Sequence, residues 1–513
     1  MDATTIPANT VSFRDFLFKD KRNRTILILA AVAVVIQWAV FKYFYPFASY
    51  IHGDSFAYIV AATYNVDIST YLVGYSRFIR LISAFTSSDT ILVSFQYLFI
   101  QLSILSLLFT IFYFYKPGKI TQMILLIFMT LNPLFLHLGN LVSSDGFFLG
   151  LSLIWFTTLI WIIHRPSVLL IAIQTIVFFI AFTVRYNALI YPVIMLVAFC
   201  ISKVPLKHKI IGLGSSFLLC GLFIFYTSYK YKLFTKQWQY SPFSGWQLAN
   251  NAMYTYRYVE TDKRQPVSPQ FMQLDNMVRA YFDSTRDLKK YPQEGQQAST
   301  AYMWSSTSPL YHYSDLLFKN DTNAMQYKKW ATMGPFYKSY GIHIIKKYPI
   351  HFIRYFIWPN TLKYYAPPIE FLKRYNSGQD TVTQSAIQWF GYKSKYVRTR
   401  FSKKEVQALD FYPILSGIMN IVFLSTLVCY LILKGWKDPT YYGKGLLLGS
   451  VFWLLNAGFT ITASSAALRF QSFPVTLITI LAILMVDWMA KFLTADQKKK
   501  IQIGKIESSY APA

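Results

Sequence analysis

The sequence predicts an all-α multispan membrane protein that crosses the bilayer about ten times, with a mostly helical outer domain between spans seven and eight. Three observations predict this class. Of the 513 residues, 54% are hydrophobic and only 14% are charged, which excludes an ordinary soluble enzyme. The apolar residues come in blocks of membrane-spanning length, and positive charges flank the blocks at alternate turns. One long polar stretch, residues 229–410, contains no such block.

Seven spans are predicted in the first part of the chain. The cluster Lys19, Lys21, Arg22 and Arg24 precedes the first span and predicts a cytoplasmic N-terminus. The turn Lys116-Pro117-Gly118-Lys119 combines turn residues with positive charge and predicts the next cytoplasmic loop. Asn132-Pro133 lies inside the third span, where the lost amide donor predicts a kink. The predicted spans cover residues 25–44, 92–115, 120–138, 146–163, 167–184, 188–201 and 210–226.

The rest of the chain divides into the polar stretch and three further spans. Within 229–410, apolar residues at three- and four-residue spacing predict helices over 274–290 and 331–345. The segment 344–356 mixes aromatic, basic and aliphatic residues, which suits either a helix in the headgroup region or a helix of the domain core. The last predicted spans cover 411–433, 445–461 and 473–490. The expected domains are therefore an N-terminal membrane domain (1–228), an extracytoplasmic domain (229–410), and a C-terminal membrane domain with a cytoplasmic tail (411–513).

The formal net charge of +27 does not indicate a nucleic-acid partner, because much of it lies in short loops beside apolar spans, where it sets orientation. Cys200, Cys220 and Cys429 all lie within apolar spans and indicate no disulfide framework. The sequence contains no glycine-rich phosphate loop, no nucleophile elbow and no metal-ligand spacing of His and Cys. No cofactor is therefore predicted, although a divalent metal is left open.

An acidic stretch, Ile51-His52-Gly53-Asp54-Ser55-Phe56-Ala57-Tyr58, follows the first span directly. In one interpretation, Asp54 or Ser55 caps a short helix through its side-chain oxygen. In the other, Asp54 is a catalytic acid or base held at the membrane surface, with His52 and Tyr58 beside it to bind substrate.

Arginines on the predicted outer side stand out, because the orientation rule expects few of them in short outer loops. Each of Arg77, Arg80, Arg185 and Arg469 could snorkel to the lipid headgroups. Together they suggest an anion site, since guanidinium groups bind phosphate through two parallel hydrogen bonds. Asp145 begins the fourth span and is either a helix cap or a second acid at the depth of Asp54. If the spans pack as a bundle, two acids and four arginines would converge.

Three places in the chain carry a resemblance to the GT-C superfamily of membrane glycosyltransferases, which includes protein O-mannosyltransferases and the aminoarabinose transferase of lipid A. Gly53-Asp54-Ser55-Phe56-Ala57-Tyr58 resembles the acid-plus-aromatic first outer loop of that family. Asn132-Pro133 followed by Ser144-Asp145-Gly146-Phe147-Phe148 is similar to its third span, second acidic position and fourth span. Leu468-Arg469-Phe470 ahead of Phe473-Pro474 is similar to the arginine-aromatic and proline pattern that opens a late span. No DxD pair occurs in either outer loop, and 229–410 matches no assigned part of the family.

The resemblance implies transfer of a sugar from a polyprenyl-phosphate donor to a lipid or glycan acceptor on the outer face of a membrane, such as the bacterial inner membrane. It implies Asp54 as the base and Asp145 as an orienting acid. Arg77, Arg80, Arg185 and Arg469 are then the expected ligands of the leaving phosphate. A lipid-linked sugar transporter or flippase is the alternative, against which stand the clustering of charges at one level and the absence of a visible inverted repeat. A scaffold whose basic outer domain binds envelope polymers is a third interpretation.

Overall fold

The computed structural model describes residues 11–321, 324–401, 404–437 and 442–509. In these ranges the chain is helical, and β-type pairing is limited to isolated bridges. Eight of the described helices are long and apolar enough to cross a membrane. They are α2 (Lys21–Phe44), α5 (Asp89–Tyr115), the broken helix α6–α7 (Lys119–Thr130 and Pro133–Gly139), α8 (Ser144–His164), α11 (Leu206–Thr235), α20 (Tyr412–Ile432), α21 (Tyr442–Ala463) and α22 (Ser472–Ser509). Two shorter apolar helical segments are α9 (Val168–Val184) and the pair η1–α10 (Tyr186–Ile190 and Tyr191–Ile201).

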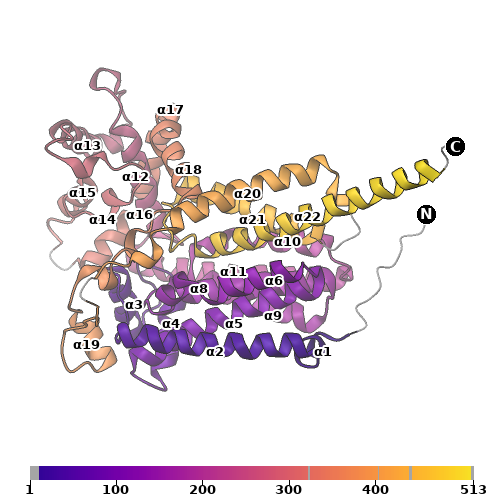
Figure 1. Cartoon of the computed structure of the whole chain (residues 1–513). Coiled ribbons are helices and arrows are strands. Elements are labelled where there is room, and N and C mark those ends of the chain that lie inside the picture. Colours follow the sequence, from indigo (N-terminus) through magenta and orange to yellow (C-terminus); the bar gives the residue numbers. More distant parts are fainter. Residues whose placement is uncertain (1–10, 322–323, 402–403, 438–441, 510–513) are drawn as a thin grey trace.

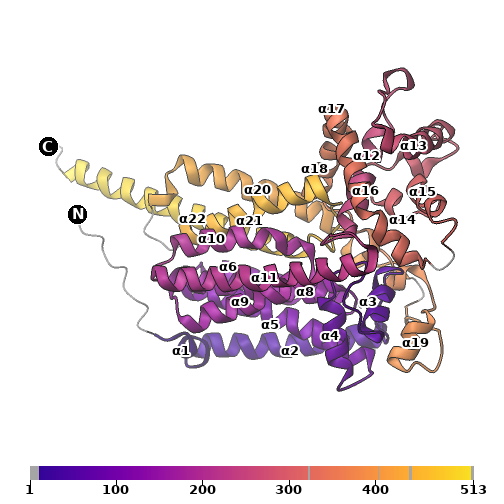
Figure 2. The same cartoon turned by 180° about the vertical axis from the view of Figure 1, so that it is seen from behind.

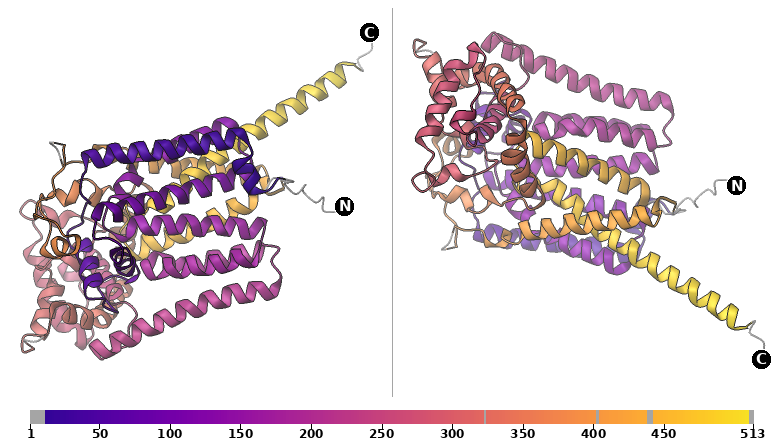
Figure 3. Two further views of the ribbon diagram at one scale, coloured as in Figure 1. Left: turned by 90° about the horizontal axis from the view of Figure 1, so that it is seen from below. Right: turned by 90° about the horizontal axis from the view of Figure 1, so that it is seen from above.

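The apolar helices run side by side in one bundle, and the polar part of the chain lies at one end of it (Figure 1, Figure 2). Helix α1 (Phe13–Phe18) and the last turns of α22 lie at the opposite end (Figure 3). Helix α8 is the centre of the bundle and is buried along almost its whole length, because α5, α9, α10 and α22 all pack against it. A helix apolar on every side is expected at such a position.

The third span is broken at Asn132-Pro133 as predicted, and the Asn132 side chain caps α7 by accepting a hydrogen bond from the Leu134 amide at 2.9 Å. The seventh span was expected to end near residue 226, but α11 continues to Thr235. Its last turns contact two other parts of the chain: the Tyr231 hydroxyl hydrogen-bonds the carbonyl of Ser69, in the loop between α2 and α5, at 2.9 Å and the hydroxyl of Tyr327, in the polar part, at 2.9 Å.

Two long helices, α12 (Pro242–Tyr256) and α16 (Gln326–Lys347), form the core of the polar part and pack along each other. They approach closely at Gly245, where an added Cβ would collide with the Gly334 carbonyl. The predicted helix over 274–290 is α13 (Met272–Ser284), which ends earlier, while α16 begins earlier than the predicted 331–345. Shorter helical pieces surround this pair: η2 (Thr261–Lys263), η3 (Pro269–Phe271), η4 (Pro292–Gly295), α14 (Ala301–Trp304) and α15 (Pro309–Leu317).

The chain then returns to the bundle through a series of short elements. The single helix considered for 344–356 does not form: α16 ends at Lys347, and Pro349 begins the short α17. Helix α18 packs on α20 and α21, and its first residue, Trp358, is exposed. The elements in order are α17 (Pro349–Phe352), the π-helical η5 (Ile353–Ile357), α18 (Trp358–Tyr365), η6 (Glu370–Leu372), η7 (Tyr375–Gly378), α19 (Gln384–Phe390) and η8 (Gln407–Leu409); η9 (Gly435–Lys437) follows α20.

The loop between α2 and α5 contains two short helices, α3 (Asp54–Thr63) and α4 (Gly74–Ser83). A β-bridge between Ser49 and Leu141 joins this loop to the turn before α8. The Ser49 amide donates to the Asn140 carbonyl at 2.8 Å, and the Val142 amide donates to the Ser49 carbonyl at 2.9 Å. This bridge holds the start of α3 beside the start of α8.

Candidate functional site

Four charged side chains form a continuous chain of ion pairs where α3, α8 and the loop before α22 meet. A terminal nitrogen of Arg469, Nη1, lies 2.7 Å from Asp54 Oδ2 and 3.3 Å from Asp145 Oδ2. Arg185 Nη1 contacts the other oxygen of Asp145. The Asp145 side chain is fully buried and that of Arg469 is 5% exposed, whereas the Asp54 side chain is 21% exposed. Asp54 is therefore the most exposed member of this charge cluster and the one of its two acids that solvent or a substrate can reach.

Neither acid caps a helix, so the capping interpretation of Asp54 and Asp145 is wrong. Gly53, with φ of 95°, is the N-cap of α3, and no side chain caps that helix. Ser55 accepts a hydrogen bond from the Ile51 amide instead. Asp145 lies in the first turn of α8 and accepts a hydrogen bond from the Ser143 hydroxyl at 2.7 Å. Both carboxylates thus face the arginines, near helix N-termini that favour negative charge.

Backbone contacts fix the loop that carries Arg469. The buried side chain of Asn360, on α18, donates to the Thr460 carbonyl at 2.9 Å and accepts from the Ala466 amide at 3.2 Å. The guanidinium carbon of Arg469 lies over the rings of Phe371 and Phe470, 4.3 Å from the centre of each. Packing on two aromatic faces favours arginine over lysine at this position.

The two carboxylates decide the charge state of Arg469. Burial alone would lower the pKa of its guanidinium group, but the negative charges of Asp54 and Asp145 outweigh burial and raise that pKa. Arg469 therefore stays positively charged. Its Nε atom is buried and has no hydrogen-bond partner among the described residues. A buried donor without a partner costs free energy, so an additional acceptor at Nε would stabilise the cluster.

Two tyrosines complete the cluster on the side of Asp54. The Tyr71 hydroxyl donates to Asp54 Oδ1 at 2.6 Å, and burial together with the Asp54 charge raises the pKa of Tyr71, so it stays protonated. The predicted substrate ligand Tyr58 is buried, hydrogen-bonds the Ser144 hydroxyl at 2.9 Å, and packs on Tyr71 with ring centres 5.1 Å apart. Tyr71 was missed from the sequence because it lies in an irregular loop with no periodic pattern.

The polar part of the chain reaches this side of the site. The ring of Tyr71 lies 6.2 Å from that of Phe243 at the start of α12, and 6.3 Å from that of Trp304 at the end of α14. Trp304 is 41% exposed. The open edge of the charge cluster is therefore bordered by aromatic side chains from residues 229–410, which the sequence did not connect to the site.

Arg77 and Arg80 do not join the charge cluster, so the expectation that four arginines converge is wrong. Arg77 pairs with Asp67 at 3.2 Å on the surface, and Arg80 donates to the Ala62 carbonyl at 2.9 Å. The cause is the amphipathic pattern of α4, which buries Tyr75, Phe78 and Ile79 on one face and leaves both arginines on the other. The interpretation that Arg185 and Arg469 extend to the lipid headgroups is also wrong, because both side chains form ion pairs with Asp145.

His52 lies beside the cluster without a hydrogen bond from its ring to any described residue. Its side chain is exposed and meets Phe56 edge-on at 5.1 Å, while its backbone amide donates to the Ser377 hydroxyl at 3.3 Å. Partial burial of the ring lowers its pKa below the ordinary value. His52 is therefore neutral at pH 7, and it borders the acidic loop without contacting Asp54.

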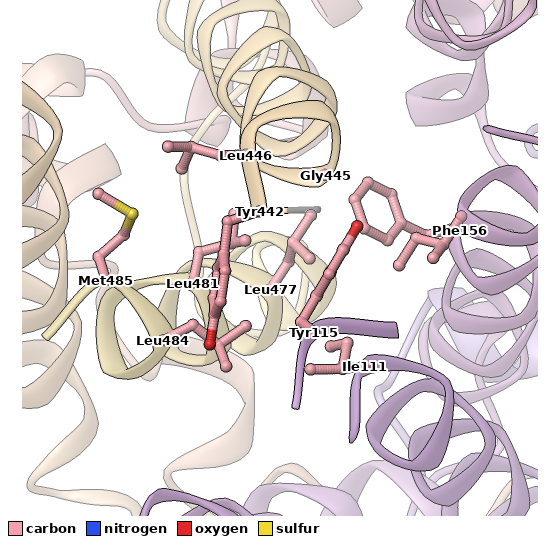
Figure 4. A pocket seen from close by; sticks show the side chains of 11 residues that line it. Ile111, Tyr115, Phe156, Tyr442, Gly445, Leu446, Leu477, Leu481, Leu484 and Met485 are labelled. Atoms are coloured by element: carbon pink, nitrogen blue, oxygen red, sulfur yellow. The ribbon is translucent and has the colours of Figure 1, made fainter. Parts of the chain in front are cut away.

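In the described part of the chain, no group of three or more His, Cys, Asp or Glu side chains is arranged to hold a metal ion. A small apolar cavity of about 20 Å³ lies toward the other end of α8 and α22, where Tyr115, Tyr442 and Met485 are among its lining side chains (Figure 4). It contains no charged group and lies apart from the acids, so it offers nothing to a phosphate or a sugar.

Comparisons of the chain with protein-family models, with curated proteins and with solved structures find no match. The apolar helices and the ion pairs define the class of the protein. It is a multi-pass integral membrane protein with an Asp-Arg-Asp-Arg charge cluster at one end of its bundle.

Proposed function

We propose that the protein is a glycosyltransferase that moves a sugar from a polyprenyl-phosphate donor to a lipid or glycan acceptor. The observation that carries this proposal is the charge cluster, in which a partly exposed carboxylate, Asp54, lies 2.7 Å from the buried cation Arg469. Transfer of a sugar from a phosphate needs both elements side by side: a base for the acceptor proton and a cation for the departing phosphate.

In the proposed reaction, Asp54 accepts the proton of the acceptor hydroxyl. The acceptor oxygen forms a bond to the anomeric carbon of the sugar as the bond from that carbon to the phosphate oxygen breaks. The phosphate leaves with the electron pair and carries the lipid with it. Asp54 is the suitable base because it is the more exposed of the two acids, while Asp145 is enclosed and orients both arginines.

The leaving phosphate is assigned to Arg469 and Arg185. Arg469 offers its unpartnered Nε, and Arg185 is 15% exposed at the edge of the cluster. Charged donors held by packing and by second partners do not need to reorganise when negative charge develops, which is the usual source of such stabilisation. Arg77 and Arg80 have no part in this proposal, because their contacts lie on the solvent face of α4.

The proposed topology counts the eight long and two shorter apolar helical segments as about ten spans. Both termini are then cytoplasmic, and the charge cluster and residues 236–410 lie on the outer face, with a bacterial inner membrane as the proposed location. Support comes from the lysines and arginines that flank the turns at the end of the bundle opposite the polar part.

Reporter fusions test this topology. Fusions after Lys119, Lys209 and Lys437 should report cytoplasm, and a fusion near Gln293 should report the outer compartment. The same fusions would overturn the orientation of the site if the reporter near Gln293 were active only in the cytoplasm, because Asp54 would then face the wrong side.

Release of the carrier tests the reaction itself. Membranes that contain the protein, supplied with a polyprenyl-phosphate sugar and envelope lipid or glycan acceptors, should produce free polyprenyl phosphate and glycosylated acceptor together. Membranes with the Asp54→Asn protein are the control for spontaneous hydrolysis. Movement of the intact donor across the bilayer, with its sugar unchanged, would contradict transfer and favour a flippase.

A further inference from the structure

A short surface segment outside the charge cluster carries positive charge that nothing in the proposed reaction uses. We define the basic lobe as residues 391–401, which follow α19. It contains Lys393, Lys395, Arg398 and Arg400 and no acidic residue. Figures 1 and 2 show α19 next to the end of α2 and beside α3, away from α13 and α15.

The charges of the basic lobe are uncompensated. All four side chains are exposed, and none forms an ion pair with a carboxylate of the described residues. Two acids that flank the lobe in the sequence are already paired: Asp380 with Lys404 at 3.0 Å, and Glu405 with Arg374 at 3.9 Å. Four exposed positive charges within eleven residues create a local potential that attracts anions.

The position of the lobe indicates which anions lie within reach. The Arg400 amide donates to the carbonyl of Phe44, the last residue of the membrane-spanning helix α2, at 2.9 Å. Phe401 stacks on Phe44 with ring centres 4.5 Å apart, and the Arg400 guanidinium group lies 4.3 Å from the centre of the Tyr43 ring. The end of an apolar span marks the depth of the lipid headgroups. The exposed rings of Tyr396 and Phe401 fit the same depth, where aromatic side chains gather.

Hydrogen bonds hold the lobe in a fixed shape. The Tyr392 hydroxyl donates to the buried Asp89 at 2.7 Å, and the Val397 amide donates to the Asp380 carbonyl at 2.7 Å. The Lys395 carbonyl accepts from the Val382 amide at 2.9 Å. The charges therefore stand on a preformed scaffold, which reduces the entropy lost when a ligand binds.

We propose that the basic lobe binds the headgroups of anionic phospholipids in the leaflet around the end of α2. Phosphate oxygens of the headgroups pair with Lys393, Lys395, Arg398 and Arg400, and the acyl chains lie along the apolar surface of α2. Soluble phosphate could pair with the same four charges, but binding of a soluble anion would not require the lobe to lie at the end of a membrane span. The inference does not depend on the proposed transfer reaction, because it concerns lipid binding and not turnover.

The test measures binding of a fluorescently tailed phosphatidylglycerol to the full-length protein in neutral detergent, by anisotropy, with phosphatidylcholine as the uncharged comparison. The unmodified protein should bind phosphatidylglycerol at least about tenfold more tightly at low salt, and 0.5 M NaCl should remove most of that preference. The variant K393Q/K395Q/R398Q should lose most of the preference. The matched control K289Q/K290Q/K338Q removes three exposed lysines from the polar part of the chain and should keep it.

Each other outcome overturns the proposal. Equal binding of the two lipids by the unmodified protein would remove its basis without any variant. A lobe variant that keeps the full preference, or a control that loses as much, would place the binding elsewhere. Glycerol phosphate that competes as well as the lipid at equal concentration would show a soluble-phosphate site. If the triple variant misfolds, K393Q and K395Q alone each change one solvent-exposed side chain and should still weaken binding about two- to threefold.

Discussion

Asp54→Asn should lower sugar transfer by roughly a hundredfold or more while the protein still folds and binds donor. An amide cannot accept the acceptor proton, so the chemical step loses its base. The same amide keeps one oxygen, which can accept from the Tyr71 hydroxyl or from Arg469 but not from both, because the two donors contact different oxygens of Asp54. Arg469 still has Asp145 as a partner, so the loss of stability should be about 1–3 kcal/mol. Initial rates of carrier release at saturating donor, together with the melting temperature in detergent, measure both effects.

Asp67→Asn is the matched control for Asp54→Asn. Asp67 lies in the same loop and also pairs with positive groups, Arg77 at 3.2 Å and Lys230 at 2.9 Å, but on the protein surface. The Asp67→Asn protein should transfer sugar at close to the normal rate, since surface ion pairs contribute little to stability. A normal rate for Asp54→Asn would exclude it as the base and make Asp145 the next candidate.

Arg469→Gln should be the most destabilising of the single changes considered. It removes the cation shared by Asp54 and Asp145 and leaves Asp145, which is fully buried, with Arg185 alone. Removing one partner of a buried ion pair typically costs about 3–5 kcal/mol. Donor binding should weaken as well, because the phosphate loses its enclosed cation. Thermal unfolding and binding of a donor analogue, each measured on the purified protein, separate the two losses.

Two further variants check the cause of the Arg469→Gln effect. Arg80→Gln also removes a positive charge, but Arg80 donates to the Ala62 carbonyl and pairs with no carboxylate of the charge cluster. The stability of the protein should therefore change by no more than about 0.5 kcal/mol. Adding Asp54→Asn to Arg469→Gln should restore part of the lost stability, since Asp54 then carries no unpaired charge while Asp145 keeps its ion pair with Arg185. Arg469→Gln protein with normal stability and normal donor binding would refute the role of the charge cluster.

The parts of the site that could be predicted are those at the ends of spans. Hydropathy locates the span ends beside Asp54, Asp145, Arg185 and Arg469 to within a few residues, so these four side chains could be assigned to one level of the bundle before their contacts were known. Arg77 and Arg80 were wrongly assigned to the anion site. They lie on α4, an amphipathic helix whose buried face excludes both arginines.

Other parts could not be predicted because they depend on tertiary contacts between distant irregular segments. Tyr71 reaches the cluster from an irregular loop, and Asn360, on α18, holds the loop that carries Arg469; no local sequence pattern encodes either contact. The helices of residues 229–410 were foreseen in type, but their boundaries shifted with packing, as in α13 and α16. The approach of Phe243 and Trp304 to Tyr71 follows only from the three-dimensional arrangement.

The sequence separation of the paired charges determines the order in which their ion pairs can form during synthesis. Asp145 meets Arg185 only 40 residues later, so this pair can form while the first half of the chain is entering the membrane. Arg469 follows Asp145 by 324 residues and arrives just ahead of the last span. Until Arg469 has been synthesised, Asp54 lacks its ion-pair partner, so the charge cluster is completed late in the synthesis of the chain. A nascent chain that stops before Arg469 would therefore lack the cation shared by Asp54 and Asp145, so the site cannot be complete until synthesis has reached the start of α22.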